Sequence, residues 1–422
     1  MELLVFKKRP YNERNLKKHT HLLKQIEVTM NTSTLTTKAK FENGTMFETG
    51  EEMLYVLQLN GSWYDMGKQY GSLSKEHMQA MYDVIVQPEF DKGMISQKEA
   101  FELFGTRVYA ALSLRRKQYF QGVADGLGWP LEKVIVLDQS GPMAIYLGKL
   151  HSFSGCSSLA TWGESTVDGQ TVIGRNMDWS DLFLDFPIYA TVYNPTDGSN
   201  GLVNVSWPGW QWMVTGFNDK GVYTDLHDGT SMGGNIVSVE KPSFLNSVVD
   251  YMAESDSIEA LSSRFQASRT DIASIWMLAD KSGQACAYEN TIQENRQRVS
   301  DKDSTSFATV NTFLNPDWGL GIRETQSFSL KRFENLNDRH DDVAGHIDAT
   351  SMRNIFDLPL YNEDGSFREN GGVTKPTNQD VDLTNYQVVA DLNELQMWVK
   401  LPALGSHTNW AHIDVKSLFN QK

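Results

Sequence analysis

A β-hairpin that begins at the first of two cysteines constrains the fold more than any other feature of the sequence. Two β-prone runs, residues 154–162 and 171–179, flank an Asp-Gly pair at 168–169. Such a pair favours a tight hairpin because both of its residues tolerate positive φ. The sequence therefore predicts that the second run folds back alongside the segment that begins at Cys156.

Cys156 has the sequence neighbours of a nucleophilic thiol. The hairpin would place the guanidinium of Arg175 and the carboxylate of Asp178 beside it. The thiolate is the reactive form of cysteine, and a nearby arginine lowers the thiol pKa because it favours the charged state. The alternative is an ordinary buried cysteine beside a hairpin ion pair of little energetic value. The combination of the three residues favours the nucleophile.

Three motifs lie in this hairpin: Gly155-Cys156-Ser157-Ser158, Asp168-Gly169 and Gly174-Arg175-Asn176-Met177-Asp178-Trp179. Together they resemble the cysteine branch of the N-terminal-nucleophile (Ntn) hydrolases. The resemblance is greatest to the acyl-coenzyme A:6-aminopenicillanate acyltransferases, peptidase family C45, and more distant to choloylglycine hydrolases and acid ceramidase. Precursors of these families cut themselves before the cysteine, which here implies cleavage between Gly155 and Cys156.

The chemistry of the residues agrees with such a cleavage. A new α-amino group has a pKa of about 7.7 to 8.0, so it can accept the thiol proton near neutral pH. Gly155 has no Cβ and can adopt the strained backbone that lets the Cys156 thiol reach the preceding carbonyl. Nucleophile and base would then belong to one residue.

Composition restricts the cellular context and the partners. The formal charge of −15 argues against a general nucleic-acid binder, which needs a basic face. The two cysteines, Cys156 and Cys286, are far apart in the chain, so a reducing compartment is the simpler interpretation. No apolar run approaches the roughly 20 residues of a membrane helix. We expect a cytoplasmic protein with neither nucleic-acid nor membrane partners.

The chain is expected to divide into three segments: a polar extension over 1–50, a mainly helical propeptide over 51–155 and a catalytic domain over 156–422. In the propeptide, a short strand at 54–59 precedes a helix that starts with a capping box at Ser62 and ends at Pro88, and a second helix covers 98–124. We expect the propeptide to stay bound to the catalytic chain after cleavage.

Beyond Cys156 the pattern changes to strands, with a helix over 243–265 and a weakly ordered stretch over 370–384. Grouped strands and helices suit a layered α+β sandwich rather than alternating βα units. The resemblance implies four layers, αββα, built on antiparallel sheets. At 422 residues the chain exceeds one typical domain, although a large layered fold can hold this many around one core.

The resemblance also assigns roles to other residues. Asp178 would hold the new amine, and Arg175 would support the thiolate and the carboxylate. Asn311, in a Val-Asn step, would donate to the oxyanion, and Arg332 would lie near the site. The family usually supplies a further asparagine about ten residues after a Gly-x-Asn turn. Here that region contains His227, which could donate, and an aspartate that could not donate while ionised.

The sequence predicts a self-processing Ntn cysteine hydrolase or acyltransferase. It would cleave an amide or thioester through a Cys156 acyl-enzyme and transfer the acyl group to water or an amine. Aromatic residues could line an apolar acyl pocket: Trp179, Phe183, Trp207, Trp210 and Trp212. We expect no metal and no cofactor other than coenzyme A in a thioester substrate.

Two alternatives stay open. A papain-like thiol hydrolase would use Cys156, His227 and Asn311, but such enzymes place the cysteine at the start of a helix. A binding or scaffold protein that is never processed is the second alternative. The intact set of Gly155, Cys156, Arg175 and Asp178 counts against it.

Overall fold

The computed structural model describes residues 35–149, 155–319, 321–325, 328–357, 383–402 and 409–420. All of them belong to the second of the two units into which the chain divides, residues 33–422, and only this unit is described. Of the stretch 370–384, expected to be weakly ordered, residues up to 382 lie outside the described residues.

The described residues form two β-sheets. The ten-stranded sheet has the order β1 (Thr36–Phe41), β2 (Gly44–Glu48), β3 (Leu54–Gly61), β6 (Ile188–Pro195), β7 (Leu202–Ser206), β8 (Thr215–Asn218), β9 (Val222–Asp228), β10 (Ser274–Asp280), β11 (Gln284–Asn290) and β12 (Asn295–Val299). The six-stranded sheet has the order β13 (Ser306–Val310), β4 (Gly155–Gly163), β5 (Gly169–Trp179), β14 (Leu383–Asp391), β15 (Gln396–Lys400) and β16 (Ala411–Asp414). Strand pairs are antiparallel except for β3 and β6, which run parallel.

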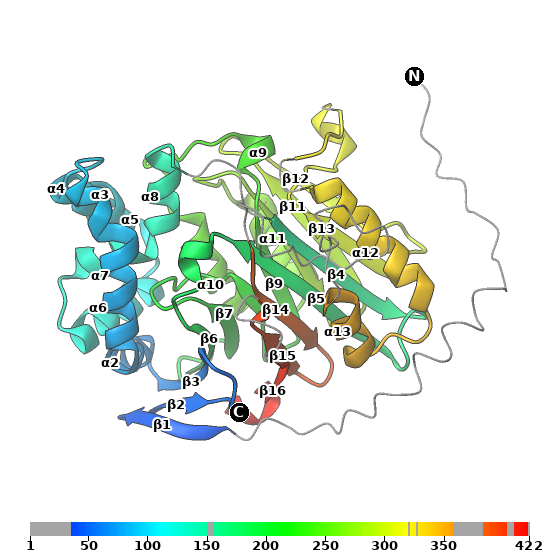
Figure 1. Ribbon diagram of the computed structural model, residues 1–422, viewed down its shortest axis with the longest axis horizontal. Helices are drawn as coiled ribbons and strands as arrows, with labels where there is room; N and C mark the ends of the chain where they lie inside the picture. Colours follow the sequence, from blue (N-terminus) through cyan, green and yellow to red (C-terminus); the bar gives the residue numbers. More distant parts are fainter. Residues whose placement is uncertain are drawn as a thin grey trace. The chain divides into compact units, whose positions relative to one another are not determined.

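Helices cover the outer faces of both sheets, as Figure 1 shows. Helices α10 (Phe244–Glu254) and α11 (Ile258–Ala267) contact the ten-stranded sheet. Helices α12 (Ser329–Val343) and α13 (Ala349–Asp357) contact the six-stranded sheet, and β4 faces β9 between the two sheets. The expected α+β fold with two layered, largely antiparallel sheets is therefore confirmed. Burial of apolar side chains between these layers stabilises the arrangement.

Two N-terminal strands lie in a segment where no strands were expected. Strands β1 and β2 occupy residues 36–48, inside the expected polar extension, and pair with β3, which pairs in turn with β6. This part of the chain therefore extends the ten-stranded sheet. The interpretation of the first 155 residues as a polar extension and a mainly helical propeptide was incomplete, because pairing with a distant strand leaves no local sequence signal.

Two helices before Cys156 pack unusually closely. Helix α2 (Trp63–Met81) begins with the predicted Ser62 capping box and packs on α6 (Leu114–Leu127). A Cβ on Gly67 would lie 2.0 Å from the Tyr119 carbonyl oxygen. Only glycine allows this approach.

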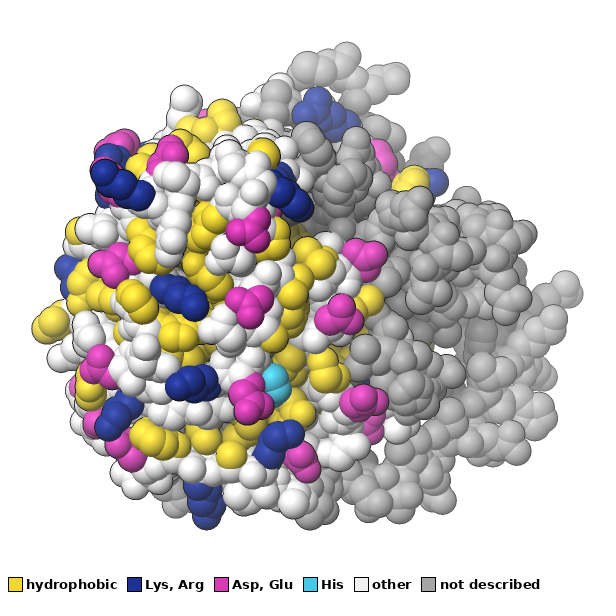
Figure 2. All heavy atoms as spheres, turned by 60° about the vertical axis from the view of Figure 1, so that its left-hand side comes forward, with side chains coloured by type: hydrophobic (Ala, Val, Ile, Leu, Met, Phe, Trp, Pro, Cys, Tyr) yellow, Lys and Arg dark blue, Asp and Glu magenta, His cyan; other side chains and the backbone are white. Residues whose placement is uncertain are grey.

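On the face over the N-terminal helices, acidic and basic side chains are interspersed with apolar ones, as Figure 2 shows.

Three predicted helix boundaries were wrong. Pro88 does not end the first helix: the chain continues through a π-helical turn, η1 (Tyr82–Val86), into α3 (Gln87–Asp91), and Pro88 lies in the first turn of α3. The second helix is interrupted at Leu112, which is extended, and Ser113 caps the next helix. The third ends at Glu254, and Ser257 caps α11.

The remaining elements are short. They are α4 (Gln97–Ala100), η2 (Phe101–Thr106), α5 (Arg107–Ala111), α7 (Leu131–Asp138), α8 (Ser140–Tyr146), η3 (Asp181–Phe183), α9 (Thr230–Gly233), η4 (Pro316–Trp318) and α14 (Val415–Leu418). Helix α8 matters for the site because it borders the pocket beside Cys156.

Candidate active site

The predicted hairpin is present as β4 and β5, but it is not closed by a tight turn at Asp168-Gly169: residues 164–168 form the loop, and Gly169 already pairs with Gly163. Its register pairs Gly155 with Asp178, Cys156 with Met177, and Ser158 with Arg175. The side chains of Cys156, Arg175 and Asp178 are all buried. The structure thus places the Arg175 guanidinium beside the Cys156 thiol and pairs Asp178 with the preceding residue, Gly155.

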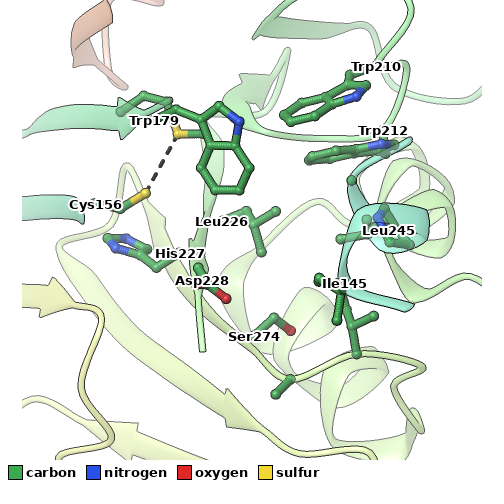
Figure 3. A pocket seen from close by; sticks show the side chains of 15 residues that line it. Ile145, Cys156, Trp179, Trp210, Trp212, Leu226, His227, Asp228, Leu245 and Ser274 are labelled. Carbon is green, nitrogen blue, oxygen red and sulfur yellow. Dashed lines mark hydrogen bonds between the residues drawn. The ribbon is translucent and has the colours of Figure 1, made fainter. Parts of the chain in front are cut away.

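The Cys156 thiol contacts Arg175 and the thioether of Met177. Arg175 Nη2 lies 3.7 Å from Cys156 Sγ and 2.9 Å from Met177 Sδ. The two sulfur atoms are 3.6 Å apart, and a dashed line at Cys156 marks this contact in Figure 3. Burial raises the pKa of Cys156 to about 11, although the positive charge of Arg175 lowers it in part. The thiol of the uncut chain is therefore protonated at neutral pH, and it needs a base to react.

Arg175 also reaches across to the ten-stranded sheet. Its Nη1 lies 3.4 Å from Asp225 Oδ1, and both side chains are fully buried. Asp225 accepts hydrogen bonds from Ser158 Oγ at 2.5 Å and Tyr223 OH at 2.8 Å. Burial alone would raise the pKa of Asp225, but the neighbouring His227, the charge of Arg175 and the hydrogen bonds from His227 and Ser158 hold it at about 2. An ionised carboxylate therefore lies behind the nucleophile.

Asp225 was missed by the sequence interpretation. Tyr223, Asp225 and His227 alternate along β9, so their side chains share one face of a buried strand. Three polar side chains on one buried face are unusual, because a buried polar group is costly unless it is hydrogen-bonded. This alternation was the signal that could have identified Asp225.

Asp178 is bound from β14. Thr384 Oγ1 donates a hydrogen bond of 2.5 Å to Asp178 Oδ1. In the strand register, Asp178 lies opposite Gly155, the residue before the expected cleavage point. Asp178 is therefore anchored at the strand position opposite the residue that precedes Cys156.

Asn311 and Arg332 hold the backbone of Cys156. The Cys156 N–H donates to Asn311 Oδ1 at 2.6 Å, and Arg332 Nη2 donates to the same oxygen at 3.0 Å. Arg332 Nη1 donates to the Cys156 carbonyl oxygen and to Ser157 Oγ. The Asn311 amide nitrogen donates to the Asp228 carbonyl at 3.0 Å, so it is engaged away from an oxyanion in this arrangement.

His227 lies in the wall of the same pocket as Cys156. Its Nε2 is 2.8 Å from Asp225 Oδ1 and 3.1 Å from Ser158 Oγ. Burial lowers the pKa of His227, and the charge of Asp225 opposes this only in part. The imidazole is therefore neutral at neutral pH.

The pocket beside Cys156 is small and apolar. Its volume is about 50 Å³, and its lining comes from both sides of the expected cleavage point, as Figure 3 shows: Gly141, Pro142, Ile145, Cys156, Met177, Trp179, Trp210, Trp212, Leu226, His227, Asp228, Leu245, Ile272, Ala273 and Ser274. Of the five aromatic residues proposed for it, Phe183 and Trp207 instead pack against Trp210, with ring centroids 5.0 and 5.1 Å away.

Side chains that could ligate a metal are dispersed in the described part of the chain. Among these residues, no three or more His, Cys, Asp or Glu side chains are grouped so that they could hold a metal ion. In the same residues, no helix is long and apolar enough to cross a bilayer.

Comparisons with known proteins give distant similarities. No protein-family profile matches the chain. Protein dcd1B of Dictyostelium discoideum is 24% identical over 213 residues, which are 43% of this chain and 40% of the length of that relative. The chain thus matches less than half of the length of this curated relative.

Several solved structures are also similar. Penicillin V acylase from Agrobacterium tumefaciens matches with a TM-score of 0.42 and 15% identity over 63% of this chain and 88% of that chain. A mutant of conjugated bile acid hydrolase from Clostridium perfringens has a TM-score of 0.42 and 15% identity over 63% and 95%. The N-acylethanolamine-hydrolyzing acid amidase ortholog of Caenorhabditis elegans has a TM-score of 0.39 and 12% identity over 56% and 93%. Each match thus includes most of the other protein's chain and little more than half of this one.

Proposed function

We propose that this chain is a self-processing cysteine amidohydrolase or acyltransferase of the Ntn type, with Cys156 as the nucleophile. The observation that supports this most is the double anchoring of Cys156. Its backbone N–H is bound by Asn311, and its thiol lies beside Arg175 at an apolar pocket.

Among the described residues of the uncut chain, no base contacts the Cys156 thiol. The thiol hydrogen-bond contacts in the described part of the chain are with Arg175 and Met177, and neither readily accepts a proton. Cleavage before Cys156 would convert its backbone nitrogen to an amine with a pKa of about 7.7 to 8.0. Asn311 Oδ1 already accepts a hydrogen bond from this nitrogen and would orient the amine.

Self-processing begins with attack of Cys156 Sγ on the carbonyl carbon of Gly155. The Sγ–C bond forms, the thiol proton passes to the Cys156 nitrogen and the C–N bond breaks, so the Gly155 acyl group moves from nitrogen to sulfur. Water then hydrolyses this thioester, which releases the Gly155 carboxylate and leaves the Cys156 thiol and amine free. The chain becomes two, residues 1–155 and 156–422, and we propose that they stay associated.

Substrate cleavage repeats this chemistry on an external acyl group. Sγ forms a bond to the substrate carbonyl carbon, the thiol proton passes to the Cys156 amine, and the amine gives it to the leaving nitrogen as the C–N bond breaks. Water or an amine then takes the acyl group from sulfur. Asn311 would donate to the oxyanion after its amide nitrogen leaves the Asp228 carbonyl.

The pocket indicates which part of a substrate binds there. Its walls include Ile145, Trp210, Trp212 and Leu245, which offer apolar surface and no charge. An apolar acyl group would lose water favourably in such a pocket. The acyl donor would be an amide or, in the acyltransferase reaction, a thioester such as that of coenzyme A.

The papain-like alternative fits the geometry less well. Cys156 begins a strand, and His227 Nε2 is engaged by Asp225 and Ser158. Among the described residues, His227 Nδ1 has no hydrogen-bond partner, so no hydrogen bond joins it to the thiol. A thiolate–imidazolium pair would need that contact.

The test measures the intact mass of wild type, Cys156→Ala and Cys286→Ala by mass spectrometry under denaturing conditions. The proposal expects wild type and Cys286→Ala to split between Gly155 and Cys156, and Cys156→Ala to remain one chain. Cys286 is a matched control because it is the other buried free cysteine. A wild type that stays at full length would favour the papain-like enzyme or the unprocessed binding protein.

A further inference from the structure

The two ring nitrogens of His227 have different surroundings. Nε2 faces Asp225 Oδ1 and Ser158 Oγ. The ionised Asp225 can only accept, and the Ser158 hydroxyl proton is directed to the other Asp225 oxygen. Nε2 therefore carries the proton of the neutral imidazole, and Nδ1 carries a free lone pair.

The Nδ1 lone pair is buried without a hydrogen-bond partner in the part of the chain that the structure describes. The side chain of His227 is fully buried, and its residue forms part of the pocket wall together with Cys156 (Figure 3). Buried polar atoms of proteins are nearly always hydrogen-bonded, so an exception beside a candidate nucleophile indicates a group that a ligand would satisfy.

We propose that His227 Nδ1 accepts a hydrogen bond from the N–H of the scissile amide, and that the site thereby selects amides that carry an N–H. This inference rests on the proposed function and specifies its substrate class. A thioester has no hydrogen to donate at the leaving atom, and an N-alkylated amide has lost it. Both would leave Nδ1 unpaired inside a dry pocket.

No proton is transferred to His227 in this role. The amide N–H donates to Nδ1 while Sγ attacks the carbonyl carbon, which orients the leaving nitrogen. The additional proton that this nitrogen requires comes from the Cys156 amine. A site built to hydrogen-bond a substrate N–H discriminates strongly against an analogue that lacks it, because its own polar group is then left unpaired.

Two substitutions separate the two sides of the ring. The side-chain amide of glutamine extends about as far as Nε2, so His227→Gln can keep a donor to Asp225 but loses the acceptor at the Nδ1 position. The amide of asparagine reaches only the Nδ1 position, so His227→Asn keeps an acceptor there and loses the Asp225 contact. Tyr223→Phe is the control, since it removes another hydrogen bond to Asp225 without changing His227.

The probes are an acyl anilide, its N-methyl anilide and the thioester of the same acyl chain. The readout is the ratio of kcat/KM for the N–H anilide to that for each of the other two. We expect His227→Gln to lower both ratios by roughly tenfold, the loss of one hydrogen bond to a buried acceptor. His227→Asn and Tyr223→Phe should keep them within about threefold of wild type.

The outcomes are distinguishable. If wild type hydrolyses the anilides and His227→Gln has the same kcat/KM ratios as wild type, the role of His227 is overturned and the proposed function stands. Wild type that is active on none of the probes and is not cleaved at Cys156 overturns the proposed function, and the inference with it. If His227→Gln fails to fold, ¹⁵N spectra of histidine-labelled Cys156→Ala protein decide. Protonated Nε2 and bare Nδ1 at pH 7 support the inference, and a protonated Nδ1 overturns it.

Discussion

Arg175 on β5 and Asp225 on β9 form a fully buried ion pair at 3.4 Å, which joins the two sheets directly behind the Cys156 thiol. The pair places one positive and one negative charge in a buried layer, where Ser158, Tyr223 and His227 also contact Asp225. Because Arg175 also contacts Cys156 Sγ, the ion pair connects the stability of the fold to the position of the nucleophile.

Asp225→Asn is expected to destabilise the protein. The substitution keeps the side-chain shape but leaves the Arg175 charge buried and uncompensated, which typically costs about 3 to 5 kcal/mol. Urea unfolding at neutral pH measures the change in free energy of unfolding. Glu394→Gln is the control, because Glu394 and Lys416 form an exposed ion pair whose loss should cost at most about 1 kcal/mol. Equal effects of the two substitutions would contradict the prediction.

Stability should fall in acid because of the same carboxylate. The pKa of Asp225 is about 2 in the folded protein, below the ordinary value of about 3.9 that applies when it is unfolded. A lowered folded-state pKa stabilises the fold above about pH 4, and this stabilisation, about 2 to 3 kcal/mol, is lost as the pH falls to about 2. Urea unfolding between pH 6 and pH 2 measures it. Asp225→Asn should show a shallower decline over this interval.

Asn311→Ala is expected to slow both self-processing and turnover. It removes the acceptor that binds the Cys156 N–H and a partner of Arg332. Removal of one such polar group from an acyl-transfer site typically lowers kcat by about 10² to 10³. The time course of the cleaved fraction, followed by mass spectrometry, measures the first effect. Asn295→Ala is a matched control, since the Asn295 amide donates to the carbonyl oxygens of Phe265 in α11 and of Ser268 directly after α11. Comparable slowing of self-processing in Asn295→Ala would indicate a general loss of structure.

Gly67→Ala should destabilise the contact between α2 and α6. A Cβ at this position would lie 2.0 Å from a backbone oxygen, so the helices would have to separate, and such overpacking typically costs about 1 to 3 kcal/mol. Gly321 is the control position because a Cβ added there meets nothing within 4 Å. Thermal unfolding should show a clear loss of Tm for Gly67→Ala only. An unchanged Tm would mean that the helices can move apart freely.

Local chemistry in the sequence determined the centre of the site. The two β-prone runs around Asp168-Gly169 predicted a hairpin that brings Arg175 beside Cys156, because the pairing of neighbouring strands follows from nearby residues. The Ser62 capping box likewise marked the start of α2. These features needed no information about distant parts of the chain.

Tertiary structure alone decided what surrounds that centre. Asp225 reaches Arg175 only because β9 and β5 belong to sheets that face each other, and the sequence separation of the two residues carries no signal for this. Pairing of β3 with β6 brings the N-terminal strands into the large sheet in the same way. Turns and caps depend on a few neighbouring residues, whereas sheet pairing and buried charge networks depend on which surfaces the whole chain buries together.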